Sequence, residues 1–187
     1  MGVARSGPLM LLDLKALTEP REHLERTYPA SAFDATDDFA VADPVALNLD
    51  VEKVRDGYRL AGRVTTRLRV PCCRCVEPCD TSLDAAFDLR YVPQERNTGT
   101  GEAEIAEDDL STAFYRDEQI DLGQLMREQF YLGLPMKPLC REDCCGLCSV
   151  CGANLNVAKC GCSAEWHDPR LAVLEGLLHG RTEKDQT

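Results

Sequence analysis

Hydrophobic and polar residues alternate regularly between residues 47 and 92, and this alternation predicts three successive strands. The first strand covers residues 47–52, where every second side chain is apolar. Asp56-Gly57 follows, a pair typical of two-residue hairpin turns, so the return strand over residues 58–70 should pair with the first. A third strand covers residues 81–92. Three neighbouring antiparallel strands form a meander that has one face in water.

The two faces of the return strand differ in polarity. Its even positions are mostly apolar, which predicts that they face the core. Its odd positions carry four arginines, which we call the arginine row: Arg59, Arg63, Arg67 and Arg69. Alternate residues of a strand lie about 6.6 Å apart, so these side chains should follow one another along the outer face.

Weaker patterns precede and follow the meander. Residues 9–17 alternate imperfectly and predict a short first strand, whereas residues 21–26 are compatible with a turn or two of helix. Residues 34–43 are acidic and predict a loop. Residues 112–120 are compatible with one or two short strands.

Two helices are predicted in the second half of the chain. Asp121 can cap the first, which runs through Leu132 before Gly133 stops it. The apolar residues near helical spacing in this helix are Leu122, Leu125, Met126, Tyr131 and Leu132. A last short helix should begin at Asp168-Pro169 and end before Gly180.

Composition limits the partners and the location of the chain. Its 187 residues carry a formal net charge of −11, so bulk attraction cannot hold a nucleic acid. Contact with RNA would therefore need a local basic patch or a partner protein. No apolar stretch is long enough for a membrane span, and the first residues lack a signal-peptide pattern. We expect a cytoplasmic, reducing location with no membrane partner.

All eleven cysteines fall in two runs. The first run holds Cys72, Cys73, Cys75 and Cys79. The second run holds Cys140, Cys144, Cys145, Cys148, Cys151, Cys160 and Cys162. In a reducing compartment such clusters indicate metal ligands or catalytic thiols rather than disulfides.

Spacing in the second run predicts a structural zinc site. Cys148 and Cys151 are placed as in a zinc knuckle, and Gly152 allows the chain to turn beneath the sulfurs. Cys160 and Cys162 form a second pair, which completes a tetrahedral four-sulfur site. An iron–sulfur cluster uses the same ligands, and so does a thiol switch that releases metal. Structural zinc binds zinc-finger peptides with about 10–16 kcal/mol, so we expect this module to fold only with metal.

A second zinc is geometrically feasible, so the cofactor is expected to be one zinc ion or two. Its ligands would be Cys72, Cys75, Cys140 and Cys144. Spacing alone does not choose between Cys144 and Cys145, because Cys145 and Cys148 also form a CxxC pair.

The chain lacks the motifs of an enzyme. It has no nucleophile–base pair, phosphate loop or HExxH motif, and a catalytic zinc needs an open position, often with histidine ligands. Of the three histidines, only His167 lies near the cysteine module. We expect a non-enzyme with no small-molecule substrate.

Several motifs follow one another along the chain: Cys72-Cys73-Arg74-Cys75, the helix ending in Gly133-Leu134-Pro135-Met136-Lys137-Pro138-Leu139-Cys140, Cys144 to Asn156, Cys160-Gly161-Cys162, and Asp168-Pro169-Arg170-Leu171. In this order they resemble the YceD family over about residues 45–180. The resemblance implies a role in the accumulation of large-subunit ribosomal RNA and in biogenesis of the large ribosomal subunit. The family-type cysteines are Cys72, Cys75, Cys140, Cys144, Cys148, Cys151, Cys160 and Cys162, which leaves Cys73, Cys79 and Cys145 as extras.

The expected fold class is therefore α+β, an antiparallel β-meander with one or two packed helices and a C-terminal cysteine-rich zinc-binding module. The α+β domain should span residues 1–139, with an acidic insert near residues 95–109. The zinc module and terminal helix should span residues 140–180 and pack on the first domain, before a polar disordered tail over residues 181–187.

Two kinds of partner remain open: a large-subunit ribosomal RNA precursor and a basic ribosomal protein. The arginine row, extended by Arg74, could contact RNA phosphates. Alternatively, acidic residues of the same outward parity on neighbouring strands could neutralise the row through ion pairs: Asp50, Glu52, Asp84 and Asp88. A different function class is a zinc- or redox-responsive regulatory protein that uses the clustered thiols.

Overall fold

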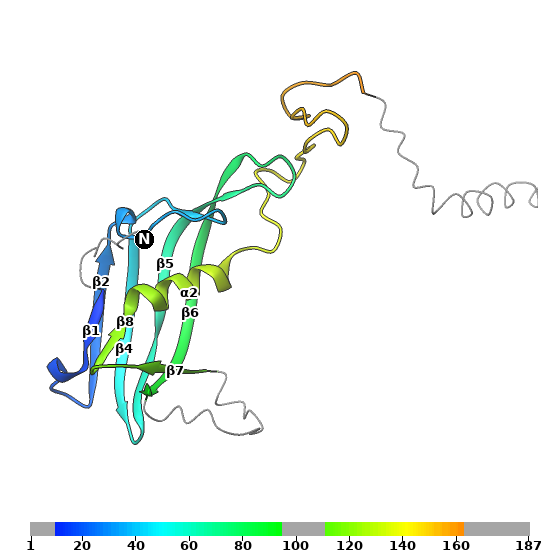
Figure 1. Cartoon of the computed structure of the whole chain (residues 1–187). Coiled ribbons are helices and arrows are strands. Elements are labelled where there is room, and N and C mark those ends of the chain that lie inside the picture. The colour runs from blue at the N-terminus through cyan, green and yellow to red at the C-terminus, as the bar shows by residue number, and fades with distance from the viewer. Residues whose placement is uncertain (1–9, 95–110, 163–187) are drawn as a thin grey trace, which may run out of the picture. The chain divides into compact units, whose positions relative to one another are not determined.

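The computed structural model of the chain describes residues 10–94 and 111–162 (Figure 1). The chain forms two compact units, residues 1–142 and 143–187. Every helix and strand of the described residues belongs to the first unit. No helix among these residues is long and apolar enough to cross a membrane. The predicted acidic insert, the helix after residue 168 and the polar tail lie outside the described residues.

A six-stranded sheet forms one layer of the first unit. Its strands are β2 (Arg21–Tyr28), β3 (Ala40–Val41), β4 (Val45–Val54), β5 (Gly57–Pro71), β6 (Pro78–Pro93) and β7 (Thr112–Tyr115). The order across the sheet is β2-β4-β5-β6-β7, and the short β3 pairs with β5. The predicted meander is confirmed as β4, β5 and β6, which pair antiparallel in sequence order.

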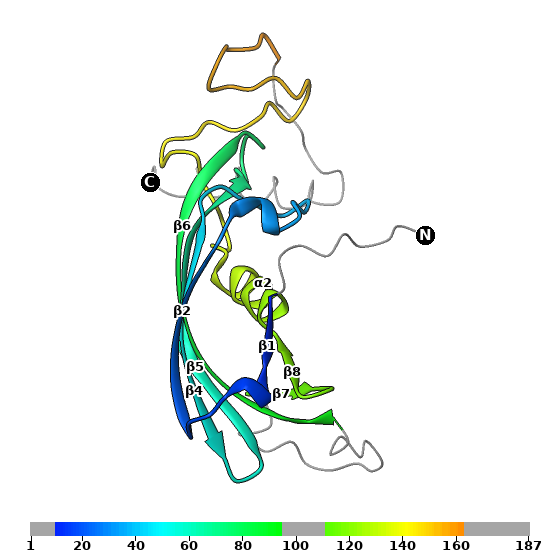
Figure 2. The same cartoon turned by 90° about the vertical axis from the view of Figure 1, so that its left-hand side faces the viewer.

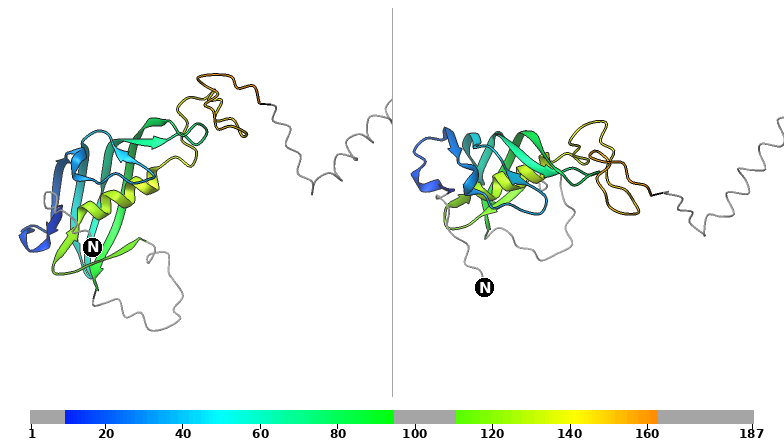
Figure 3. Two further views of the ribbon diagram at one scale, coloured as in Figure 1. Left: turned by 45° about the horizontal axis from the view of Figure 1, so that its top comes forward. Right: turned by 90° about the horizontal axis from the view of Figure 1, so that it is seen from above.

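The second layer of this unit covers one face of the sheet. It contains a two-stranded sheet of β1 (Leu11–Asp13) and β8 (Gln119–Asp121), followed by α2 (Leu122–Gly133). Short 3-10 helices cover Leu14–Ala16 and Ala30–Ala32. Figures 2 and 3 show β1, β8 and α2 on the same side of the curved main sheet. On the opposite face, side chains such as Arg59, Arg63 and Arg67 are exposed.

The core lies between these layers and follows the predicted alternation. On β5, Leu60, Val64 and Leu68 are fully buried beneath the helix, whereas the arginines between them are exposed. The helix begins where predicted, because the Asp121 carboxylate accepts a hydrogen bond from the Gln124 backbone N–H at 2.9 Å. The predicted short strands of residues 112–120 are β7 and β8.

Residues 21–26 are a strand, so the expectation of helix there was wrong. They belong to β2, which pairs with β4 in register, with Leu24 opposite Leu49. Alternate side chains of β2 are exposed and half-buried. Pairing with the long strand β4 satisfies the backbone hydrogen-bonding groups along one edge of β2. The free energy gained by this long-range pairing outweighs a weak local preference for helix.

The sheet is mixed rather than purely antiparallel, because β6 and β7 pair in parallel. Parallel neighbours need a crossover connection of about a dozen residues or more, and residues 95–110 supply that length. The local pattern of two short strands could not reveal their direction.

The hairpin turn lies one residue earlier than predicted. Val54 pairs with Gly57, so the two connecting residues are Arg55 and Asp56. Gly57 instead allows a close approach, because a Cβ at that position would lie 2.0 Å from the Tyr91 carbonyl oxygen. The glycine is required by the neighbouring strand as well as by the bend.

The buried face of α2 also differs from the expectation at its C-terminal end. Tyr131 and Leu132 are 48% and 78% exposed, whereas Phe130 and Gln129 are buried. Phe130 packs edge-on against Phe33 and Phe39, with ring centroids 5.2 and 5.8 Å away. The position of those two rings, which are remote in sequence, selects the face that points inward.

Candidate functional site

The turn between β5 and β6 presents two cysteines of the first run. The Cys72 N–H donates to Glu77 O, and the Val76 N–H donates to Cys72 O, both at 2.9 Å. Val76 adopts a left-handed φ of 64°, which closes this tight turn. The backbone bond from Cys73 N to Pro138 O at 2.8 Å holds the chain after α2 against the turn. As a result the Sγ atoms of Cys75 and Cys140 lie 3.7 Å apart.

These sulfurs belong to one of two groups of four cysteines. The first group is Cys72, Cys75, Cys140 and Cys144, and the second is Cys148, Cys151, Cys160 and Cys162. Within each group the four Sγ atoms lie within 4.8 Å of one another. A tetrahedron with zinc–sulfur bonds of about 2.3 Å has edges of about 3.8 Å, close to the Cys75–Cys140 separation. Each group could therefore hold a four-coordinate metal ion.

The eight cysteines brought together are those that the family resemblance implies, and the three extras stay out of both groups. Cys73 and Cys145 are exposed, and Cys79 is half-buried, with its thiol 3.5 Å from Val70 O. All eleven cysteines have free thiols.

The second group is built on a tight turn within the second unit. Gly152 N–H donates to Cys148 O at 2.9 Å, and Cys148 N–H donates to Ala153 O at 2.8 Å. Gly152 adopts a left-handed φ of 72°, which a side chain would disfavour. This geometry is the knuckle turn predicted from spacing.

An asparagine that sequence reasoning overlooked orients Cys144. Asn156 Nδ2 donates to Cys144 Sγ at 3.3 Å, and its Oδ1 accepts from the Cys145 N–H at 2.8 Å. Cys144 is 2% exposed. Spacing left open whether Cys144 or Cys145 is the ligand. The hydrogen bonds of Asn156 hold the Cys144 sulfur in the first group, and Cys145 lies outside it. The sequence signal that could have indicated this role was the pair Asn154 and Asn156, which lies in the run that resembles the YceD family.

Backbone donors favour a thiolate in each group. Hydrogen bonds from backbone N–H groups, first of all that of Cys140, lower the pKa of Cys72 to about 6. The N–H groups of Cys151 and Val150 likewise lower the pKa of Cys148 to about 6. A hydrogen bond with Cys151 and the charge of that sulfur raise the pKa of Cys162 to about 12. A bound dication would relieve this repulsion, because it attracts every sulfur.

The arginine row is a ladder of ion pairs. The four arginines each meet an aspartate on a neighbouring segment: Arg59–Asp88 at 2.8 Å, Arg63–Asp84 at 2.7 Å, Arg67–Asp43 at 3.3 Å and Arg69–Asp80 at 2.8 Å. The pair with Asp88 raises the pKa of Arg59 and lowers that of Asp88. The row therefore carries little net positive charge.

The predicted acidic partners of the arginine row were only partly right. Asp84 and Asp88 bind the row, and Glu52 lies 4.0 Å from Arg59. Asp50 was wrongly included, since it binds His23 at 2.9 Å instead. Asp43 and Asp80 were missed because they lie at the margins of the predicted strands. Arg74 is exposed in the turn between Cys73 and Cys75.

Comparisons with known proteins agree on one family. A family model described as large ribosomal RNA subunit accumulation protein YceD matches residues 60–178. No solved structure matches the chain.

Two relatives from plants carry a matching description. A chloroplastic YCED homolog 1 of Zea mays, named as a large ribosomal RNA subunit accumulation protein, is 31% identical over 158 residues, covering 72% of this chain and 54% of its own. The protein of the same name in Arabidopsis thaliana is 28% identical over 169 residues, covering 79% and 53%.

A bacterial relative has no described function. It is an uncharacterised protein of Mycobacterium tuberculosis, 35% identical over 133 residues, covering 71% of this chain and 61% of its own. The chain thus spans between half and two thirds of the length of these relatives.

Proposed function

The chain belongs to the YceD family, and from this membership we propose that it is a non-enzymatic factor in the accumulation of large-subunit ribosomal RNA and in biogenesis of the large ribosomal subunit. It acts by binding ribosomal RNA or a ribosomal protein, in the cytoplasm. The observation that carries this proposal is the family match over residues 60–178, which includes most of β5, all of β6 and α2, and all eight grouped cysteines.

Zinc is the metal that we propose for both cysteine groups. Four thiolates whose sulfurs lie within 4.8 Å of one another suit four-coordinate zinc, and a four-sulfur site would leave no open coordination position for a reacting water. The metal would supply folding free energy, while the eight cysteines hold it and backbone N–H groups support the sulfurs. This closed donor set supports a structural rather than a catalytic role.

Changing Asn156 to aspartate is expected to weaken metal binding at the first cysteine group by about 10- to 100-fold. The carboxylate keeps an acceptor for the Cys145 N–H but removes the donor to Cys144 Sγ and places a negative charge beside the thiolate. Competition with a chromophoric zinc chelator measures this loss. Asp143→Asn in the same segment is the control, and equal affinity in both variants would contradict a supporting role for Asn156.

Sedimentation of the tagged chain from lysate tests the proposed function. The chain is expected to travel with precursors of the large subunit. Exchange of both Arg63 and Arg67 for glutamine should preserve this association and lower the thermal midpoint slightly, since both arginines are committed to ion pairs.

A failure to sediment with large-subunit precursors would count against the proposal. Loss of association at an unchanged thermal midpoint in the double variant would instead make the arginine row a contact surface. Metal loss under mild oxidant, with no ribosomal association, would favour the zinc- or redox-responsive regulator.

A further inference from the structure

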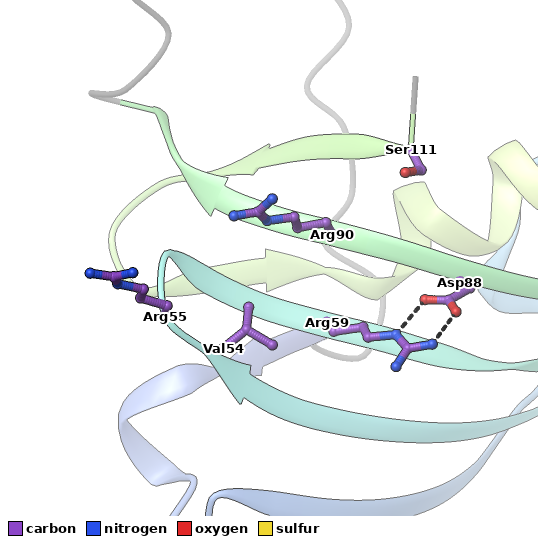
Figure 4. A pocket seen from close by; sticks show the side chains of 6 residues that line it. All are labelled: Val54, Arg55, Arg59, Asp88, Arg90 and Ser111. Carbon is purple, nitrogen blue, oxygen red and sulfur yellow. Dashed lines mark hydrogen bonds and ion pairs between the residues drawn. The ribbon is translucent and has the colours of Figure 1, made fainter. Parts of the chain in front are cut away.

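Three arginines line a pocket of about 540 Å³ near the β4–β5 turn (Figure 4). The lining residues are Val54, Arg55, Arg59, Asp88, Arg90 and Ser111. Its volume lies within the range of about 300–1,000 Å³ that is usual for small-ligand sites. In Figure 4 the Arg59 guanidinium points to Asp88, whereas those of Arg55 and Arg90 extend the other way, toward the turn.

One of the three arginines that line this pocket is left unpaired by the described residues. Arg59 and Arg90 are directly opposite each other on β5 and β6, and such like-charged neighbours destabilise a sheet. Asp88 binds Arg59 at 2.8 Å, and Asp56 binds Arg90 at 3.3 Å. Arg55 has no ion pair or hydrogen bond with any residue of 10–94 or 111–162. Arg59 also lies 4.0 Å from Glu52, so Arg55 is the lining guanidinium that no described carboxylate pairs.

A buried donor in the pocket lacks an acceptor. The Nε of Arg90 is buried and has no hydrogen-bond partner; only it and the Tyr28 hydroxyl share this state among the side-chain nitrogen and oxygen atoms of the described residues. Buried polar groups are normally satisfied, so an unpaired Nε beside two further arginines indicates the place of an acceptor that is not among the described residues. A negatively charged acceptor at this place would also pair with the Arg55 guanidinium.

We propose that this pocket binds a phosphate group of a single-stranded RNA segment, an inference that rests on the proposed function and assigns its direct partner. Guanidinium groups donate two hydrogen bonds to a phosphate in a fixed fork. Arg55 and Arg90 have N–H groups that donate to no described residue. Val54 adds an apolar wall for the attached sugar or base. The pocket thus provides the local basic site that an acidic chain needs, at a position where the rest of the arginine row is already neutralised.

Fluorescence anisotropy with a short labelled single-stranded RNA tests the pocket in the full metal-loaded chain. Arg55→Gln is expected to lower the affinity about tenfold, because one charge-assisted contact is lost. It should also reduce the slope of log K against log salt by about 0.7. Arg55 lies in the exposed turn and makes no ion pair with described residues, so its replacement should leave the thermal midpoint unchanged.

Arg63→Gln is the control, since Arg63 lies on the same strand and face as Arg59, binds Asp84, and does not line the pocket. It should bind RNA like the parent chain. Inorganic phosphate and adenosine monophosphate, titrated while the Arg90 Nε–H signal is followed by NMR, distinguish the source of the phosphate. The RNA should saturate the shift at far lower concentration than either small ligand.

Equal RNA binding by the parent chain and Arg55→Gln would overturn the inference, as would a larger loss in Arg63→Gln. Saturation by the mononucleotide at the same concentration as RNA would overturn the assignment to an RNA strand. If the chain sediments with large-subunit precursors but binds no RNA when purified, the inference fails while the proposed function stands, and a ribosomal protein is the partner. If purified chain binds RNA through Arg55 but never sediments with precursors, the proposed function fails instead.

Discussion

Cys148→Ser is expected to release the metal ion of the second group and to unfold the knuckle turn of residues 148–153, while the sheet of the first unit stays folded. Among the described residues of the second unit, only Cys144 and Cys148 have buried side chains of the apolar class. Leu147, Val150 and Val157 are 40%, 63% and 83% exposed. The described residues of this unit thus hold no apolar core that could replace the metal, and a lost thiolate removes a quarter of its ligands.

Metal content and hydrogen exchange measure this result together. The Cys148 N–H, which donates to Ala153 O, should lose its protection, whereas amides of β5 should keep theirs. A zinc chelator added to the parent chain should produce the same pattern. Cys145→Ser is the matched control, because Cys145 is exposed and outside both groups. Full metal content in Cys148→Ser, or unchanged protection after chelation, would contradict a metal-dependent fold.

The same comparison applies to the first group. Cys72→Ser should lose one ion, and the adjacent Cys73→Ser should lose none.

Phe130→Ala is expected to destabilise the first unit by about 3–5 kcal/mol. Phe130 is fully buried and meets two aromatic rings edge-on, so its removal leaves a cavity between α2 and the segment of residues 33–39. Urea unfolding monitored by circular dichroism measures the change in free energy of unfolding.

Leu132→Ala provides the control on the same helix. Leu132 is 78% exposed, so its truncation should change stability by less than about 0.5 kcal/mol. A larger effect at Leu132 than at Phe130 would mean that the helix faces the sheet as its apolar spacing suggested, and not as the structure places it.

Local features of the fold were predictable because they depend on neighbouring residues. The meander follows from an uninterrupted alternation along β4, β5 and β6, and the start of α2 follows from the capping side chain of Asp121. The strand β2 was missed because the alternation of its charged residues is too weak to exclude a helix. Its state is decided by pairing with β4, which lies outside any local window.

Alternation and cysteine spacing, both readable along the chain, determined the meander, the capped helix, the knuckle turn and the family. Only the tertiary structure decided which distant groups meet. Cys75 and Cys140 are 65 positions apart, yet their sulfurs lie 3.7 Å apart because the turn and the chain after α2 are tied together. Asp43 and Asp80 reach the arginine row, and Arg90 comes to lie opposite Arg59, through strand register. Periodicity is a property of neighbours, whereas metal ligation and charge balance depend on distances in space, which only the packed chain defines.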